Sequence, residues 1–173
     1  MYLQDDNIIL RPLRLDDASR LALLANNKKI ADNLRDRFPH PYTLQDAKDF
    51  LAMNLPLKPV QLFAIEYNGV HVGNVGVHPM DDVYRKSAEI GYFLGEEYWN
   101  KGIMSRAVKL AIDYAFAELD VVRIFTGIFD FNTASGRVLE KCGFKKEAVF
   151  EKAVFKNGNF YDEIRYAIIK NSK

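Results

Sequence analysis

The sequence is short of the residues that build disulfide-linked, zinc-binding or membrane-spanning proteins. It contains one cysteine, Cys142, so no internal disulfide can form, and a reducing, cytoplasmic location is the simplest expectation. The three histidines lie well apart from one another and from this cysteine, so we expect no metal site. No apolar run approaches transmembrane length, and residues 1–13 are too acidic for a signal peptide, so no membrane association is predicted.

An excess of charge of one sign is also absent. The 24 basic and 23 acidic side chains leave a formal net charge of +1, so nothing in the total indicates a nucleic-acid partner or an acidic membrane surface. A length of 173 residues suits one sizeable core, and we expect residues 1–173 to form a single domain.

The hydrophobic periodicity predicts a mixed α+β fold with about seven strands and helices packed on the sheet. Strands are expected at 7–13, 61–67, 70–80, 86–94, 121–129, 145–155 and 159–169, and helical segments within 16–34, 44–55, 100–119 and 132–142. Asn-Gly pairs at 68–69 and 157–158 predict hairpins with type I′ turns. Asp16 or Asp17 is expected to cap the first helix, and Thr43 with Asp46 to form a capping box.

The helix expected at 100–119 begins in a loop that offers almost no N-capping side chain. Free backbone N–H groups at a helix N-terminus bind phosphate, and Gly102 lets a ligand approach the backbone closely. A bound pyrophosphate could therefore take the place of the missing cap. The alternative is that no ligand binds there and Gly102 only eases the turn into the helix. About thirty residues later Asn132 begins another helix, where by itself it reads as an N-cap.

In combination these segments resemble the GNAT superfamily of acetyl-CoA-dependent N-acetyltransferases. The strand "AEIGY", the loop "WNKGIMS", a long helix, a strand and "NTASGRVLEKCGF" follow one another in the family's order. The likeness is nearest to the RimJ/RimL-like branch and extends over almost the whole chain. It implies a GNAT fold with splayed central strands, acetyl-CoA as co-substrate, a primary amine as acceptor and a possible homodimer.

The resemblance also implies a set of cofactor-binding residues. The family's loop is commonly Gln/Arg-x-x-Gly-x-Gly/Ala, and of Trp99–Met104 only Gly102 fits it strictly. Because backbone amides do most of the binding, the side-chain departures weaken the match only a little. The implied contacts are amides of Lys101, Gly102, Ile103, Met104 and Ser105 on the pyrophosphate, strand residues Tyr92, Phe93 and Leu94 along the pantetheine arm, Asn132 on its other side, and Arg106 and Lys141 at the adenosine phosphates. Arg106 and Lys141 also read as ordinary solvated helix residues.

Transfer to an amine needs a base and a stabilised oxyanion, and gains from an acid. Glu89 of "AEIGY" is the base candidate, and the alternative is an ion pair with a neighbouring strand. The N–H near Tyr92 is the candidate oxyanion donor. Many family members place an acid Tyr where this chain has Leu139, so Ser135, which the branch resemblance places near the coenzyme sulfur, is expected to act instead, unless it only bonds local backbone. Cys142 is expected to fill buried space.

The acceptor side is carried by the Pro-stiffened loop "LRDRFPHPYT". The resemblance implies that Arg35, Arg37, Phe38 and Tyr42 border the acceptor groove, and that Asp162 lies near the site. Each of the charged residues also reads as an ordinary solvated side chain. The acceptor is a protein N-terminal amine or a small-molecule amine. The alternative function is a catalytically silent acyl-CoA-binding sensor or scaffold, suggested by Leu139.

Overall fold

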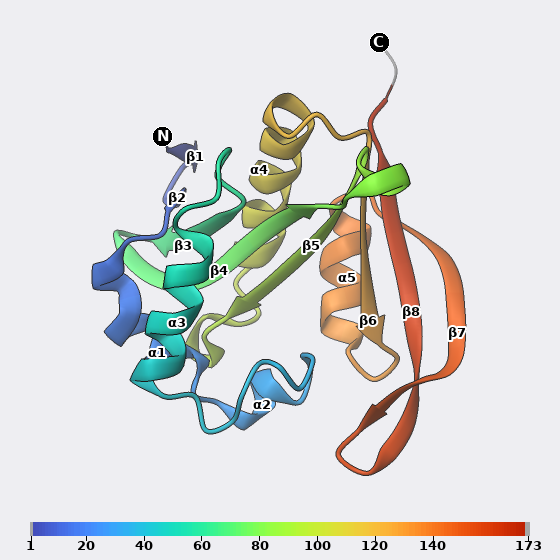
Figure 1. Cartoon of the computed structure of the whole chain (residues 1–173), viewed down its shortest axis with the longest axis horizontal. Coiled ribbons are helices and arrows are strands. Elements are labelled where there is room, and N and C mark those ends of the chain that lie inside the picture. Colours follow the sequence, from blue (N-terminus) through green and yellow to red (C-terminus); the bar gives the residue numbers. More distant parts are fainter. Residues whose placement is uncertain (1, 172–173) are drawn as a thin grey trace.

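One mixed sheet of eight strands runs through residues 2–171, which the computed structural model describes (Figure 1). The strands lie in the order β1-β2-β3-β4-β5-β6-β8-β7, and only β5 and β6 are parallel neighbours. Their bounds are β1 Leu3–Asp5, β2 Ile8–Pro12, β3 Leu62–Tyr67, β4 Val70–Pro79, β5 Ser87–Leu94, β6 Arg123–Phe129, β7 Lys145–Lys156 and β8 Asn159–Ile169. The predicted mostly antiparallel sheet is confirmed. The eighth strand is β1, whose three half-buried or exposed residues carry no alternating pattern.

Five α-helices and three 3₁₀ turns connect these strands. Their bounds are η1 Leu15–Asp17, α1 Ala18–Ala25, α2 Lys28–Ala31, α3 Leu44–Asn54, η2 Asp82–Tyr84, η3 Glu96–Tyr98, α4 Ile103–Glu118 and α5 Thr133–Lys141. The expected helical segment at 16–34 is broken between α1 and α2, because the Asn26 side chain accepts a hydrogen bond from the Tyr42 amide and Asn27 caps α2. Among the helices described, none is long and apolar enough to span a bilayer.

The local capping and turn predictions hold with one exception. Thr43 and Asp46 form the capping box of α3. In both Asn-Gly turns the two residues have positive φ, as type I′ turns require. Asp17 occupies the N-cap position of α1, but its carboxylate makes no cap bond there. The prediction is therefore right about the position of Asp17 and wrong about the capping bond, because a buried arginine binds that carboxylate.

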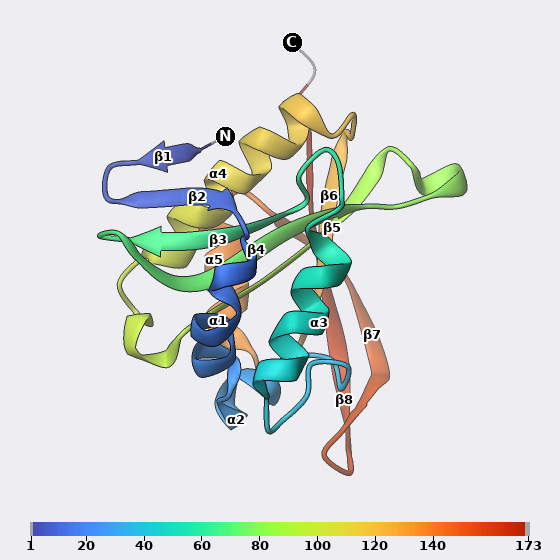
Figure 2. The same ribbon diagram turned by 60° about the vertical axis from the view of Figure 1, so that its left-hand side comes forward.

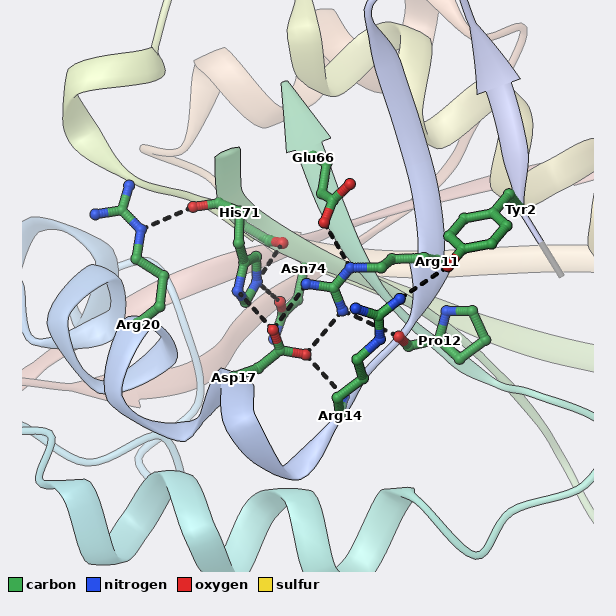
Figure 3. Close-up of polar contacts among 10 residues, drawn as sticks. Tyr2, Arg11, Pro12, Arg14, Asp17, Arg20, Glu66, His71 and Asn74 are labelled. Carbon is green, nitrogen blue, oxygen red and sulfur yellow. Dashed lines mark hydrogen bonds and ion pairs between the residues drawn. The ribbon is translucent and has the colours of Figure 1, made fainter. Parts of the chain in front are cut away.

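Asp17 belongs to a polar cluster buried between η1, β2, β3 and β4 (Figure 3). The Arg11 guanidinium donates to both Asp17 oxygens, at 2.8 and 2.7 Å, and to Glu66 at 2.6 Å. His71 Nε2 lies 2.8 Å from Asn74 Oδ1, while its Nδ1 is unpartnered and 3.7 Å from Asp17. Ion pairing offsets the cost of burying Arg11 and Asp17, so this cluster fixes η1 and α1 on the sheet.

Two apolar cores lie on opposite faces of the sheet. Side chains alternate along β3, so that Phe63 and Ile65 join the core under α4 and α5. Leu62 and Ala64 join the core under α1 and α3. Figure 1 shows these helix pairs covering the sheet, with the wide β7–β8 hairpin extending beyond them. The α1–α3 face of β5, β6 and β8 therefore carries no helix.

The C-terminal hairpin bends back to the loop between α2 and α3 (Figure 2). Lys156, at the end of β7, is only 6% exposed and its Nζ lies 2.8 Å from Asp36 Oδ1. The Asn157 side chain donates to Asp32 at 3.0 Å. These two contacts join segments 120 and 125 residues apart, and they place the loop at 32–42 beside the uncovered sheet face.

Candidate active site

The central feature of the site is the separation of β5 from β6. The two strands pair only from Ser87 to Glu89, in register with Arg123 to Phe125, and then diverge (Figure 1). Past Glu89, β5 stays paired with β4 on its other side, as far as the Gly73–Leu94 pair. The edge of Tyr92–Leu94 that faces β6 therefore has no strand partner. An extended, amide-containing chain can bind at such an edge as an additional strand.

A pair of hydroxyl groups bridges this opening. Tyr92 Oη and Ser135 Oγ lie 2.7 Å apart, joining β5 to the first turn of α5. Burial raises the pKa of Tyr92, so the phenol keeps its proton at neutral pH. Asn132 accepts a hydrogen bond from the Ser135 amide at 3.3 Å, so it caps α5. Its own side-chain NH₂ donates to no group within residues 2–171 and is free for a ligand.

The N-terminus of α4 lies just beyond the end of β5. Gly102 is its N-cap, with φ of 72° and no side chain to accept a hydrogen bond. A Cβ at Gly102 would meet no atom within 4 Å, so the helix start faces open space. Ile103 and Met104 are buried and anchor the first turn, whereas Lys101 is exposed. The predicted uncapped helix start is present, and its geometry fits a pyrophosphate.

The structure places the two predicted phosphate-binding cations differently. Arg106 is engaged by the first hairpin, where its guanidinium donates to Asp5 at 2.6 Å and to Asn7 at 3.2 Å. That pairing gives Arg106 a structural role in attaching β1 to α4. Lys141 ends α5 and is exposed. Both assignments to the adenosine phosphates stay predictions.

Glu89 is paired with Arg35, from the loop at 32–42, and not with a residue of a neighbouring strand. From the sequence, Glu89 is predicted as the base and Arg35 as a residue of the acceptor groove, with no contact expected between them. Glu89 and Gly91 share the α1–α3 face of β5, while Ile90 and Tyr92 point to the α4 side, as alternation predicts. The carboxylate therefore faces the uncovered surface and the hydroxyl pair faces the other side of the same strand.

The other predicted acceptor residues divide into packing and exposed groups. Phe38 packs against Phe93 and Tyr42, with ring centroids 5.6 and 5.0 Å away. Tyr42 is only 6% exposed, and burial raises its pKa to about 12, so its ring belongs to the core under α1 and α3. Arg37 is exposed. The structure thus gives Tyr42 a packing role and leaves Phe38 and Arg37 at the edge of the uncovered face.

Asp162 is used within the C-terminal hairpin. Its carboxylate accepts a hydrogen bond from the Lys152 amide at 2.8 Å, where β7 bulges opposite β8. Its backbone carbonyl accepts from the Asp130 amide at 3.0 Å, which links β8 to the end of β6. This arrangement suits a positioning role for Asp162.

Beside Glu89 the uncovered face forms a cleft of about 320 Å³. It is lined by Met80, Tyr84, Ser87, Arg123, Phe125 and Arg165. Phe125 is directly opposite Glu89 in the sheet, so the cleft continues from the carboxylate. Arg165 lies over the Phe125 ring at 4.9 Å and pairs with Glu163 at 2.8 Å, and Arg123 pairs with Glu147. Both arginines of the lining are therefore ion-paired with residues outside it, and the walls are partly aromatic.

Comparison with known proteins settles the family. The acetyltransferase (GNAT) domain model matches residues 7–145. The chain belongs to the GNAT acetyltransferase family. It is 30% identical over 171 residues to the putative ribosomal N-acetyltransferase YdaF of Bacillus subtilis (strain 168), covering 96% of this chain and 93% of the relative. It is 28% identical over 166 residues to the spermidine N(1)-acetyltransferase of Escherichia coli (strain K12), covering 95% and 87%.

The GNAT fold is confirmed by comparison with solved structures. RimL, a ribosomal L7/L12 alpha-N-protein acetyltransferase solved in complex with coenzyme A, superposes with a TM-score of 0.89. The match covers 98% of both chains at 22% identity, so it establishes the fold. As a family member the chain is an N-acetyltransferase, and the resemblance to the RimJ/RimL-like branch is confirmed at the level of family and fold.

His78 is a candidate site residue that was not predicted from the sequence. It stands directly opposite Glu89 in the β4–β5 pair and so shares its face. Burial lowers the pKa of His78, the Glu89 charge opposes that shift and the Arg37 charge adds to it, so the imidazole is neutral at pH 7. The signal that could have indicated His78 is the register of the strands predicted at 70–80 and 86–94, which places it opposite Glu89. Within the described residues, no group of three or more His, Cys, Asp or Glu side chains is placed to hold a metal.

Proposed function

We propose that this GNAT protein transfers an acetyl group from acetyl-CoA to a primary amine by direct attack within a ternary complex. The observation that carries the proposal is the alignment of the β5–β6 opening, the uncapped N-terminus of α4 and the Tyr92–Ser135 pair. A pantetheine arm lies along Tyr92–Leu94, with Asn132 donating from the other side. The amides from Lys101 to Ser105 then receive the pyrophosphate.

In the proposed reaction, each proton transfer has a donor or an acceptor among the residues of the site. An alkyl amine has a pKa of about 10, so it arrives as an ammonium and must lose a proton before attack. Glu89 takes that proton, and the free amine forms a bond to the thioester carbon. The N–H near Tyr92 stabilises the oxyanion. As the C–S bond breaks, the sulfur gains a proton from the Tyr92–Ser135 pair. The second proton of the nitrogen passes through solvent to that pair, so both hydroxyl groups are restored, and Glu89 releases its proton to solvent.

The acceptor is proposed to be a protein N-terminal amine or a small-molecule amine such as a polyamine. The relatives include a putative ribosomal acetyltransferase and a spermidine acetyltransferase, so both classes are represented among similar proteins. The cleft next to Glu89, lined by aromatic rings and arginines, supports the protein amine, because it offers room for residues beyond the terminus. We further propose a cytoplasmic enzyme that can form a homodimer and needs no metal.

The rival function is an acyl-CoA-binding sensor without transfer activity. It was suggested by Leu139, where many family members have a tyrosine acid. Leu139 is fully buried in the core and cannot be that acid. The Tyr92–Ser135 pair supplies hydroxyl groups from other positions, which favours the enzyme. Release of free thiol from acetyl-CoA only when amine is present supports transfer, whereas binding without release supports the sensor.

The first experiment is a thermal unfolding assay with acetyl-CoA. Saturating ligand at about 100 times its dissociation constant adds about 2.7 kcal/mol to the free energy of unfolding, so the melting temperature rises. Asn132→Ala and Gly102→Ala should reduce that rise. Thr43→Ala is the matched control, because it removes a helix cap of the same kind from α3, on the other face of the sheet. No rise for the folded wild type at millimolar acetyl-CoA contradicts the proposal.

A further inference from the structure

The Arg35–Glu89 ion pair is a weakly held contact on the uncovered sheet face. Arg35 Nη2 donates to Glu89 Oε1, and within residues 2–171 this is the one hydrogen bond of that guanidinium. The Arg35 side chain is 55% exposed and that of Glu89 28%. The second carboxylate oxygen of Glu89 accepts no hydrogen bond from the described residues. A single contact between exposed groups lacks the two-point geometry that makes arginine–carboxylate pairs strong.

The Arg35 guanidinium occupies the position at Glu89 that the ammonium group of the proposed acceptor would take. The proposed acceptor reaches the site as an ammonium ion, which carries the same unit charge and donates the same type of hydrogen bond. Glu89 is the carboxylate of β5 on the face where the acceptor is proposed to bind. An ammonium that delivers its proton to Glu89 must contact this carboxylate, so it competes with Arg35 for the same oxygen atoms.

The Arg35 side chain can leave while the loop backbone stays in place. On one side of Arg35, Asp36 is held by Lys156 at 2.8 Å. Two residues further on, the Phe38 ring packs against Phe93, and the Phe38 amide donates to the Arg35 carbonyl at 2.9 Å. On the other side of Arg35, the Leu34 amide donates to the Ala31 carbonyl at 3.1 Å. The backbone is therefore fixed on both sides of Arg35, and only a solvent-facing side chain has to rotate.

We propose that Arg35 is a place-holding counter-ion of Glu89, which the ammonium group of the acceptor displaces. The inference rests on the proposed transfer function and assigns Arg35 a specificity role in it. An uncharged acceptor such as an alcohol cannot replace a cation at Glu89, so the pair selects for amines. The acetylated product is an uncharged amide, so Arg35 returns to Glu89 once the carboxyl group has lost its proton to solvent, and the product is expelled.

The first test measures binding of a cation without any acetyl transfer. The probe is n-butylammonium chloride, titrated at constant ionic strength and followed by protein NMR shifts. Arg35→Ala should bind it about two- to fivefold more tightly than the wild type, because the competing cation is gone. Lys28→Ala is the matched control: it removes a neighbouring exposed ion pair, with Asp32 at 2.8 Å, and should bind like the wild type. Adding Glu89→Gln to Arg35→Ala should abolish the gain.

A second probe, methylguanidinium, carries the displaced group itself. It should compete with n-butylammonium in both proteins, with the same two- to fivefold gain in affinity in Arg35→Ala over the wild type. The inference is overturned if Arg35→Ala binds n-butylammonium no more tightly than the wild type, or if the gain survives Glu89→Gln. Neither result depends on acetyl-CoA, so failure here is distinct from failure of the transfer function, which the thiol-release assay reports. With an active amine, Arg35→Ala should lower KM at constant acetyl-CoA affinity.

Discussion

At the scale of single residues, the Tyr92–Ser135 pair is the proposed proton source for the departing sulfur. The two oxygens are 2.7 Å apart, and burial keeps Tyr92 a phenol, so the pair holds two protons and uses one between its members. The second proton can point to the sulfur. Because a thiolate leaves readily, we expect Tyr92→Phe and Ser135→Ala each to lower kcat by about 10²-fold, the lower end for a general acid.

The separate and combined variants distinguish a hydroxyl chain from two independent donors. If the hydroxyls act as one unit, the double variant should be little slower than either single variant. Steady-state thiol release at saturating acetyl-CoA measures this. Ser87→Ala, on the paired part of β5 away from α5, keeps the strand and the hydroxyl pair intact, so it controls for loss of a serine hydroxyl near the cleft. A wild-type kcat in both single variants would exclude the pair from catalysis.

His71 gives a residue-scale prediction about pH. Burial lowers the pKa of His71 in the folded protein below its ordinary 6.5, and its Nδ1 has no hydrogen-bond partner. The unfolded chain therefore binds a proton at a higher pH than the folded protein. Stability from this residue is complete above pH 6.5 and decreases as the pH falls through 6.5 toward the lower folded pKa.

The measurement is urea unfolding of the wild type and His71→Gln at several pH values between 7.5 and 5. Glutamine keeps a side-chain donor for Asn74 but cannot take up a proton. The loss of unfolding free energy between pH 7.5 and 5 should be smaller in His71→Gln by up to about 1 to 2 kcal/mol. His78, whose pKa is also lowered by burial, should leave part of the loss in the variant. Equal losses in both proteins would contradict the assignment.

At the scale of elements, the end of β5 is shaped by a close approach of β4. A Cβ at Gly73 would lie 2.3 Å from the Phe93 carbonyl oxygen and 2.9 Å from the Leu94 Cα. These are backbone atoms of the strand proposed to bind the pantetheine arm, so they cannot turn aside. We expect Gly73→Ala to destabilise the fold by about 2–3 kcal/mol and to weaken acetyl-CoA binding.

Gly91 provides the control for this prediction. It lies on β5, where an added Cβ would meet nothing within 4 Å. Gly91→Ala should therefore leave the free energy of unfolding near that of the wild type. Urea unfolding and the acetyl-CoA thermal shift report the two effects. If Gly73→Ala and Gly91→Ala unfold at the same urea concentration, the contact does not constrain the strand.

Local signals in the sequence are enough to predict most elements, and the cofactor-side predictions rest on the same kind of signal. Gly102 and Asn132 each begin a helix, and their roles depend on neighbours within a few residues. The contacts that the sequence did not give are those between distant segments. Arg35 and Glu89 are 54 residues apart, and Arg11 and Glu66 are 55 apart. Nothing local to Asp17 showed that its carboxylate would bind Arg11 instead of capping α1.

At the scale of the whole molecule, the face proposed to bind the acceptor is assembled from the N-terminal and C-terminal halves of the chain. The loop at 32–42 supplies Arg35 and Phe38, while the β7–β8 hairpin encloses the other side of the uncovered face (Figure 2). The Lys156–Asp36 contact joins these two parts. The Lys156 side chain is buried between the hairpin and the loop, and its ammonium group pairs with the largely exposed Asp36 carboxylate at the surface.

Removing the Lys156–Asp36 contact should increase the mobility of the loop at 32–42 and leave acetyl-CoA binding unchanged. In Lys156→Ala, hydrogen exchange of amides 32–42 should become faster, and KM for the amine should rise by up to about fivefold, because the loop is held less firmly on the sheet. The thermal shift with acetyl-CoA should match that of the wild type, because β5 and α4 do not contact Lys156. Lys86→Ala removes another lysine–aspartate pair, the exposed one with Asp120, remote from the loop, and should change neither quantity. Unchanged exchange of residues 32–42 in Lys156→Ala would show that packing of Phe38 and Tyr42 alone holds the loop on the sheet.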